Sequence, residues 1–127
     1  MAIRTELTVR VQNVPGALGR LCQVVADERV NILALSLEPA GTLHLLVDNP
    51  VRAAGLLRAR HYHVSERDVL YTVVPNGPGS LARIAALLAA EGVNLEYVYV
   101  TTVDDQSMAA VVAGVPDAAR ASAVAGL

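Results

Sequence analysis

Two asparagine-containing turns are the parts of this chain whose residue types and spacing could bind a small molecule. The stretch NVPGALGRLCQVVADERVNI starts at Asn13, and NGPGSLARIAALLAAEGVNL starts 63 residues later at Asn76. An asparagine amide offers donors and an acceptor. The first N–H groups of a helix after such a turn have no intrahelical partner, and a helix N-terminus suits a carboxylate. Because Asn31 and Asn94 add further amides, both stretches predict a site for a zwitterionic amino acid.

The same residues have a purely structural interpretation. Asparagine, proline and glycine are ordinary turn formers, and a V-N pair is an ordinary way to leave a helix. The joint repetition of the whole pattern is what favours a binding role, because a single match carries little weight.

The turns lie between elements that the hydrophobic pattern identifies. Residues 3–11 alternate as in a half-buried strand, and leucines and valines then recur at helical spacing from Leu18 to Val25. A hairpin around PAGT follows, then a helix that Asn49 caps over residues 50–60, and a brief strand at YHV. The second half repeats the order with strands at DVLYTVV, NLEYVYVTT and SMAAVVAGV, a helix from Ser80 to Glu91 and a helix near Pro116.

This order predicts an α+β protein made of two tandem ferredoxin-like βαββαβ units with antiparallel sheets, over residues 1–65 and 66–127. The second unit lacks most of its last strand, because Leu127 falls where the first unit is reaching its fourth strand. The strand edge left open would need a partner, so we expect a sheet shared between the units or between two chains.

The composition excludes several function classes. A 54% share of hydrophobic and a 17% share of charged residues indicate a globular chain rather than a disordered one. A net charge of −2 without a basic run argues against nucleic acid. Neither a signal peptide nor a membrane span is expected, so we expect a cytoplasmic protein. One cysteine, Cys22, permits no internal disulfide, and its place in the helical stripe favours a buried role.

The repeated order of strand, N-x-P-G-x-L, helix and V-N-I/L resembles the ACT domain, and two copies in one chain resemble the free-standing tandem-ACT proteins of bacteria. The resemblance implies a non-catalytic regulatory module without a cofactor or metal, which binds a small amino acid at an interface between units or subunits and modulates a partner enzyme of amino-acid metabolism. A homodimer is expected. Carried over by motif position, the effector contacts are Asn13, Val14, Pro15, Gly16, Ala17, Leu18, Asn31 and Ile32 in the first copy, and Asn76, Gly77, Pro78, Gly79, Ser80, Leu81, Asn94 and Leu95 in the second.

The sequence departs from the family pattern in one respect. Some serine-binding members carry a histidine two residues before the first motif asparagine, where this chain has Val11 and Val74. The copies also differ at Val14 against Gly77 and at Ala17 against Ser80, which predicts two inequivalent sites.

Two alternatives remain open. The chain also resembles in part the small subunit of acetolactate synthase, which implies an interaction subunit that has lost its ligand. The other is a metal-dependent enzyme using His61 and His63, expected on one face of a short strand, although no third ligand lies nearby in sequence. His44 is interpreted as structural. Tyr97 and Tyr99 are expected on one face of a strand, and Arg20 and Arg83 one turn into each repeated helix, where solvent exposure is the simpler interpretation.

Overall fold

The computed structural model describes residues 1–125. Strands and helices follow the predicted order, except that one strand stands where two were expected between the second and third helices. In chain order they are β1 (Ala2–Arg10), α1 (Ala17–Asp27), β2 (Ile32–Leu37), β3 (Thr42–Val47), α2 (Pro50–Ala59), β4 (Val64–Pro75), α3 (Ser80–Ala90), β5 (Tyr97–Thr101), β6 (Met108–Gly114) and α4 (Ala118–Ala125).

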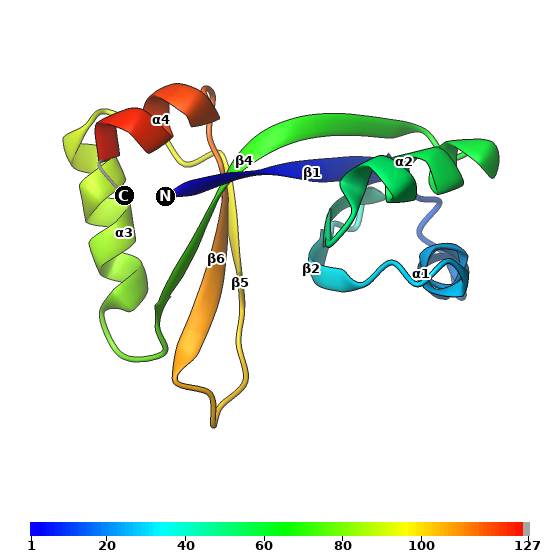
Figure 1. Ribbon diagram of the computed structural model, residues 1–127, viewed down its shortest axis with the longest axis horizontal. Coiled ribbons are helices and arrows are strands. Elements are labelled where there is room, and N and C mark those ends of the chain that lie inside the picture. The colour runs from blue at the N-terminus through cyan, green and yellow to red at the C-terminus, as the bar shows by residue number, and fades with distance from the viewer. Residues whose placement is uncertain (126–127) are drawn as a thin grey trace. The chain divides into compact units, whose positions relative to one another are not determined.

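The chain divides into two compact units, each of which holds one copy of the motif (Figure 1). The first-copy unit is Thr5–Arg67. The second-copy unit combines Met1–Arg4 with Asp68–Leu127. Both β1 and β4 cross this division, so each of these strands contributes residues to both units.

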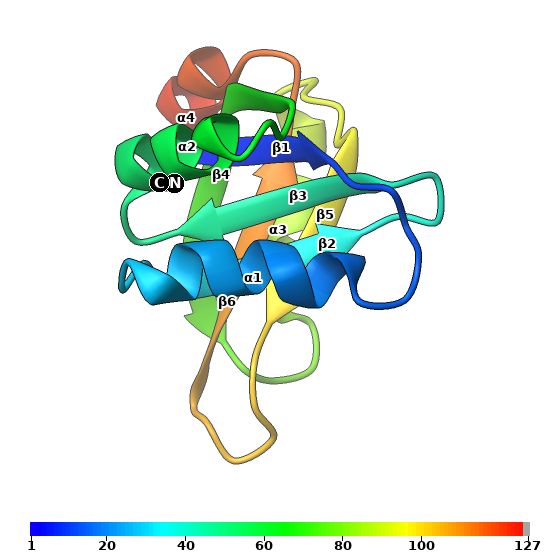
Figure 2. The same ribbon diagram turned by 90° about the vertical axis from the view of Figure 1, so that its right-hand side faces the viewer.

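In the first-copy unit the strand order is β2-β3-β1-β4, the order of a ferredoxin-like sheet. Helices α1 and α2 lie together on one face of it (Figure 2). Alternate residues of β1 and β3 point toward these helices and pair across the strands, as in Leu7 with Leu45 and Val9 with Leu43. All four side chains are fully buried, and they pack with Leu21 and Val25 of α1 and Leu57 of α2.

In the second-copy unit the order is β1-β4-β6-β5. The place of the missing last strand, beside β4, is taken by the first residues of β1. Met1 is buried in the same cluster as Leu70, Ile84 and Leu88. The Ser122 hydroxyl of α4 donates a hydrogen bond of 2.5 Å to the Met1 carbonyl. The strand beside β4 in the second-copy unit thus comes from the first residues of the chain.

The predicted α+β class and both repeated helices are confirmed. The Asn49 cap is also confirmed, because its side chain accepts a hydrogen bond from the Arg52 N–H at 3.2 Å. The separate strand at YHV is wrong, since β4 is one strand from Val64 to Pro75. The strand expected from Asn94 begins only at Tyr97.

The hydrogen bond between Ser122 and Met1 gives a test of this arrangement. We expect Ser122→Ala to lower the free energy of unfolding by about 1 kcal/mol, because it removes one partly buried hydrogen bond. The exposed neighbour offers a control, since Ala123→Ser should change stability by less than about 0.5 kcal/mol. Urea denaturation measures both. Equal stability of the two variants would contradict the docking of the N-terminal residues on α4.

Candidate functional site

A left-handed glycine starts each of the two repeated helices. Gly16 before α1 has φ 86° and ψ −11°, and Gly79 before α3 has φ 85° and ψ −8°. Glycine adopts this conformation without the strain that a Cβ introduces. Because glycine has no side chain, neither helix has a side-chain cap. In contrast, Asn49 caps α2, and the Asp117 carboxylate accepts from the Arg120 N–H near the start of α4.

The first N–H group of each repeated helix makes a hydrogen bond within the preceding turn. The Ala17 N–H donates to the Val14 carbonyl at 3.1 Å, and the Ser80 N–H lies 3.4 Å from the Gly77 carbonyl. These two groups therefore have no intrahelical partner, as expected, but each has a partner in the turn and is not free for a ligand. The Leu18 and Leu81 N–H groups make no hydrogen bond within residues 1–125. Each turn thus keeps a free donor at the positive end of its helix.

The motif asparagines also have a structural role that the sequence did not reveal. The Asn76 side-chain amide donates to the Val103 carbonyl at 3.2 Å and to the Gln106 carbonyl at 3.0 Å, and so holds the loop between β5 and β6. Asn13 repeats the contact in the first copy, with its amide 3.5 Å from the Pro39 carbonyl between β2 and β3. Asn76 therefore uses both of its amide donors and Asn13 uses one, and the amide oxygens of both remain as acceptors.

The remaining predicted residues of each copy lie far from the turn of the same copy. Since β1 and β2 are both antiparallel to β3, they are parallel, and α1 returns the chain from the end of β1 to the start of β2. A helix of 11 residues is roughly 16 Å long. Asn31 and Ile32 therefore lie at the opposite end of α1 from Asn13 and its turn. The same geometry separates Asn94 and Leu95 from the second turn.

A cavity of about 430 Å³ lies beside the second turn, between the end of β4 and the start of α3. Its lining includes Pro78, Gly79 and Ser80 of the turn. The cavity at the equivalent place in the first copy measures about 120 Å³. Among the predicted site residues, Ala17 is the one that lines it. A further cavity of about 380 Å³ lies along α1 in the first-copy unit, lined by Arg20, Gln23, Val24, Asp27, Arg60 and Tyr62, and none of the turn residues lines it. The two turns therefore differ in the space directly beside them.

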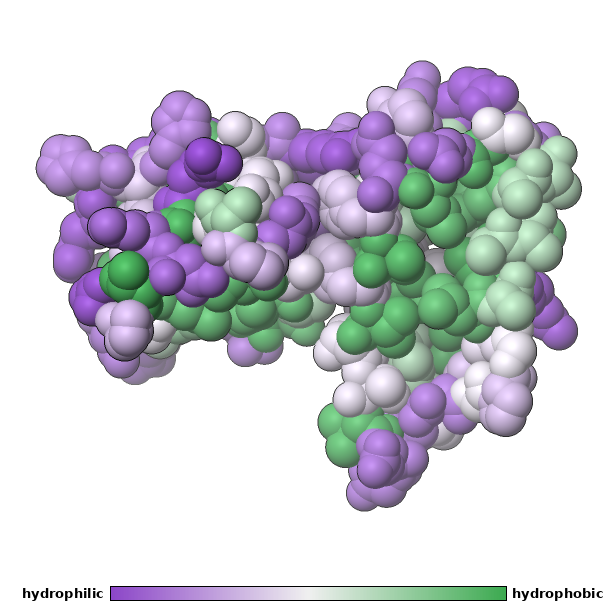
Figure 3. Space-filling model, turned by 180° about the vertical axis from the view of Figure 1, so that it is seen from behind, coloured by the Kyte–Doolittle hydropathy of each residue, from purple (hydrophilic) through white to green (hydrophobic). Residues whose placement is uncertain are grey.

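An exposed apolar edge also belongs to the second-copy unit. Strand β5 is the last strand in the sheet order, and its Val98 and Val100 are 41% and 43% exposed. Leu81 of α3 is 44% exposed. Figure 3 shows apolar surface gathered over this part of the second-copy unit, above the projecting loop between β5 and β6.

A comparison with protein families is decisive for the identity of the repeat. The model of the ACT domain matches residues 5–53 and 69–124, one match for each copy of the motif. The chain belongs to the ACT domain family. This membership supports an amino-acid-sensing regulatory role, and ACT regulatory domains are generally non-catalytic.

Solved structures share this tandem ACT fold. Protein BT0572 from Bacteroides thetaiotaomicron is 30% identical to this chain, with a TM-score of 0.87 over 96% of this chain and 85% of that one. The regulatory subunit of aspartate kinase from Thermus flavus is 14% identical, with a TM-score of 0.70 over 98% and 90%. E. coli aspartokinase III in complex with aspartate and ADP is 14% identical, with a TM-score of 0.65 over 98% of this chain and 31% of that one. No curated protein sequence matches the chain.

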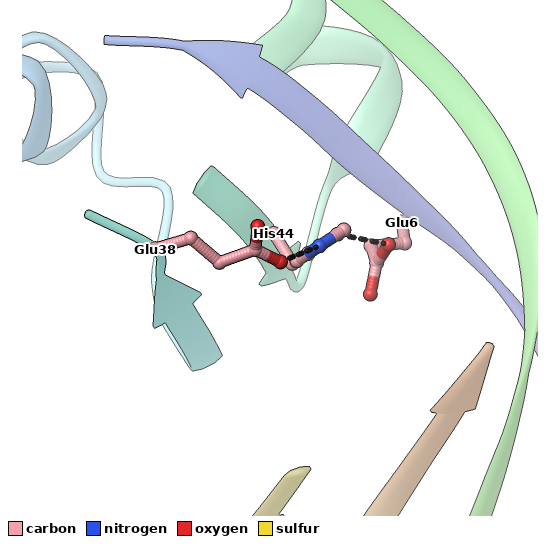
Figure 4. A network of polar contacts seen from close by, with 3 residues as sticks. All are labelled: Glu6, Glu38 and His44. Carbon is pink, nitrogen blue, oxygen red and sulfur yellow. Dashed lines mark hydrogen bonds and ion pairs between the residues drawn. The ribbon is translucent and has the colours of Figure 1, made fainter. Parts of the chain in front are cut away.

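The first ACT unit contains a polar cluster that sequence reasoning missed. Glu6 of β1 is fully buried, and its carboxylate lies 3.1 Å from Nδ1 of His44 on β3, while Nε2 of His44 lies 3.3 Å from the Glu38 carboxylate (Figure 4). A protonated imidazole donates from both ring nitrogens and a neutral one from a single nitrogen. Alternation placed Glu6 on the polar face of its strand, and nothing in the sequence indicated that this face is buried there. The structural interpretation of His44 agrees with these contacts.

The residues considered for other chemistry do not converge in this ACT protein. His61 has φ 68° in the turn after α2, and the His63 carbonyl accepts the Arg10 N–H, so the two histidines do not share a strand. Within residues 1–125 no three histidine, cysteine or acidic side chains group to hold a metal ion.

The remaining residues singled out in the sequence have structural surroundings. Burial raises the pKa of the Cys22 thiol, which favours the unreactive protonated form. Tyr97 and Tyr99 stack with ring centroids 6.4 Å apart, as the shared face predicts. No helix in the described part is long and apolar enough to cross a membrane.

The structural role of Asn76 generates a prediction. We expect Asn76→Asp to lower the free energy of unfolding by about 1 to 2 kcal/mol, because a carboxylate cannot donate to the two loop carbonyls. Asn13→Asp is the matched control and should cost less, since it loses one long contact. Urea denaturation gives the two values, and hydrogen exchange at the Gln106 amide reports on the loop. Equal losses in the two variants would show that the loop contacts of Asn76 do not stabilise the unit.

Proposed function

We propose that this chain is a non-catalytic regulatory protein of the cytoplasm that binds a small amino acid at interfaces between ACT units or subunits and modulates a partner enzyme of amino-acid metabolism. The observation that carries the proposal is the missing cap on α1 and α3. Among the four helices in the described part of the chain, the two without a side-chain cap are the two that follow the repeated motif.

The turns offer what an amino-acid main chain needs. A carboxylate is favoured at the positive end of a helix, where the free Leu18 and Leu81 N–H groups can donate to it. An ammonium group needs acceptors, and the side-chain oxygens of Asn13 and Asn76 have no hydrogen-bond partner within residues 1–125.

The predicted residues outside the turns favour a site formed jointly by two ACT units. They are Asn31, Ile32, Asn94 and Leu95. An amino acid is much shorter than the roughly 16 Å of α1, so it cannot contact Asn13 and Asn31 of one copy at once. A site containing both kinds of residue needs the turn of one unit beside the start of β2 or β5 of another. The exposed valines of β5 suit such pairing, and we propose a homodimer in which they are covered.

Regulation would follow from the same arrangement. A ligand that contacts two units binds best when the units are held at one spacing, so its binding shifts the population toward that arrangement. A partner enzyme that binds the ligand-bound and ligand-free arrangements of the units with different affinities then responds to the amino acid through this coupling. In support, one aspartokinase with a similar fold, E. coli aspartokinase III, has a structure in complex with lysine and aspartate, described as its T-state.

The competing function is a ligand-free interaction subunit similar to the regulatory subunit of acetolactate synthase. The exposed valines of β5 and exposed Leu81 favour it, because apolar surface also serves protein contacts without any effector.

A thermal-shift screen against the twenty amino acids separates the two functions. We expect one amino acid to raise the melting temperature by about 5 °C or more at 100 times its Kd, because a ligand of the folded state alone adds stability. Asn31→Ala and Asn94→Ala should reduce the shift and leave the ligand-free melting temperature unchanged, since neither side chain makes a hydrogen bond within the described residues.

Asn76→Ala is a poorer choice for this screen, because it also removes the loop contacts. No shift with any of the twenty amino acids would reject the proposed function and favour the interaction subunit.

A further inference from the structure

The cavities at the two turns are equivalent in sequence and unequal in size. Four residues that line the cavity of about 120 Å³ in the first-copy unit are Val11, Gln12, Ala17 and Arg20. The residues 63 positions later are Val74, Pro75, Ser80 and Arg83, and all four line the cavity of about 430 Å³ in the second-copy unit. The repeat therefore builds one pocket twice. In the first-copy unit a separate cavity of about 380 Å³ continues along α1, lined by Arg20, Gln23, Val24, Asp27, Arg60 and Tyr62. The space that forms one pocket in the second copy is thus divided into two cavities in the first.

Tyr62 lines both cavities of the first-copy unit, as Arg20 does, and so separates the small cavity at the turn from the larger one along α1. The tyrosine side chain, in the segment that leads from α2 into β4, lines the smaller pocket and packs against the core of the first-copy unit. No aromatic side chain lines the larger pocket. The described part of the second-copy unit has no segment between α4 and a following strand, because residues at the start of β1 stand beside β4 instead.

The two arginines also lie differently. A Cβ built on Gly16 would lie 2.9 Å from Nη1 of Arg20, so this guanidinium lies over the first turn. The same construction on Gly79 meets nothing within 4 Å. The second turn is thus uncovered, while Arg83 borders the open pocket from α3. The Arg83 side chain makes no ion pair or hydrogen bond within residues 1–125.

The chemistry of the larger pocket defines a ligand class. Arg83 is the single charged residue of its lining, and guanidinium groups bind carboxylates with two parallel hydrogen bonds. Most of the remaining lining is apolar, including Val73, Val74, Ile84 and Leu87. One cation beside an apolar wall suits a ligand with one carboxylate and an aliphatic tail, and no acidic side chain lines the pocket to repel it.

We propose that the second-copy pocket is the effector site, and that it selects a small aliphatic carboxylate through Arg83, while Tyr62 and Arg20 divide the corresponding space in the first-copy unit and leave only a small cavity at its turn. This inference rests on the proposed function and narrows it to one of the two turns and to one ligand class. Asn76 and Leu81 belong to the same turn but do not line the pocket, so Arg83 is the carboxylate partner that the pocket itself supplies. A branched aliphatic amino acid and its 2-oxo analogue both carry the required chemistry.

Isothermal titration calorimetry with L-leucine, 4-methyl-2-oxopentanoate and L-serine tests the proposal on the full chain. We expect leucine, its 2-oxo analogue or both to bind, and serine to bind at least about tenfold more weakly because it lacks the aliphatic carbons. Arg83→Met keeps the apolar stem and should weaken binding at least about tenfold. Arg83→Lys should recover part of the loss through its charge.

Arg20→Met is the matched control, 63 positions earlier on α1, and should leave the affinity within about twofold. Because Arg83 is exposed, its variants should fold normally, which circular dichroism checks. Loss of binding in Arg20→Met with retention in Arg83→Met would overturn the assignment to the second copy. Serine binding as tightly as leucine would overturn the ligand class. In both cases the proposed function would stand. No binding of either leucine or its 2-oxo analogue would also overturn the ligand class. Binding of the 2-oxo analogue together with failure of all twenty amino acids would keep the ligand class and reject the proposed function.

Discussion

The left-handed glycine before α1 and α3 is the constraint on which each unit depends. It redirects the chain from a strand into a helix that must return across the sheet, and a residue with a Cβ would be strained at this φ. The same glycine cannot cap the helix that it starts. A requirement of the fold therefore leaves free N–H donors at two positions, and these donors are the basis of the proposed effector sites.

The exchange of strand residues between the units breaks the symmetry of the repeat. The first-copy unit is completed by the start of β4, which Tyr62 and His63 precede. The second-copy unit is completed by Met1–Arg4, and no aromatic side chain lines the cavity at its turn. The two turns can therefore keep the same backbone and differ in the space beside them. We attribute the predicted inequivalence of the two sites to this difference in packing more than to the difference between Val14 and Gly77.

Sequence reasoning was most successful where local chemistry decides the structure. The turn residues, the helical stripes and the Asn49 cap act over a few neighbouring residues, and the predicted α+β class and family follow from their repetition. Sequence reasoning failed where residues far apart in the sequence come into contact. The contact of Asn76 with the loop carbonyls at Val103 and Gln106 and the burial of Glu6 against His44 depend on tertiary packing. The alternation of β1 has no feature that shows which part of its polar face is buried.

The central claim is that the uncapped turns, and the second above all, bind the effector. The most direct measurement is a titration of the ¹⁵N-labelled chain with the bound amino acid, followed by amide chemical shifts. The account predicts the largest shifts at Gly79, Ser80 and Leu81, where the helix donors face the ligand, with smaller shifts at the start of β5. Shifts confined to residues outside both turns, with the amides of Gly16–Leu18 and Gly79–Leu81 unchanged at saturation, would contradict it.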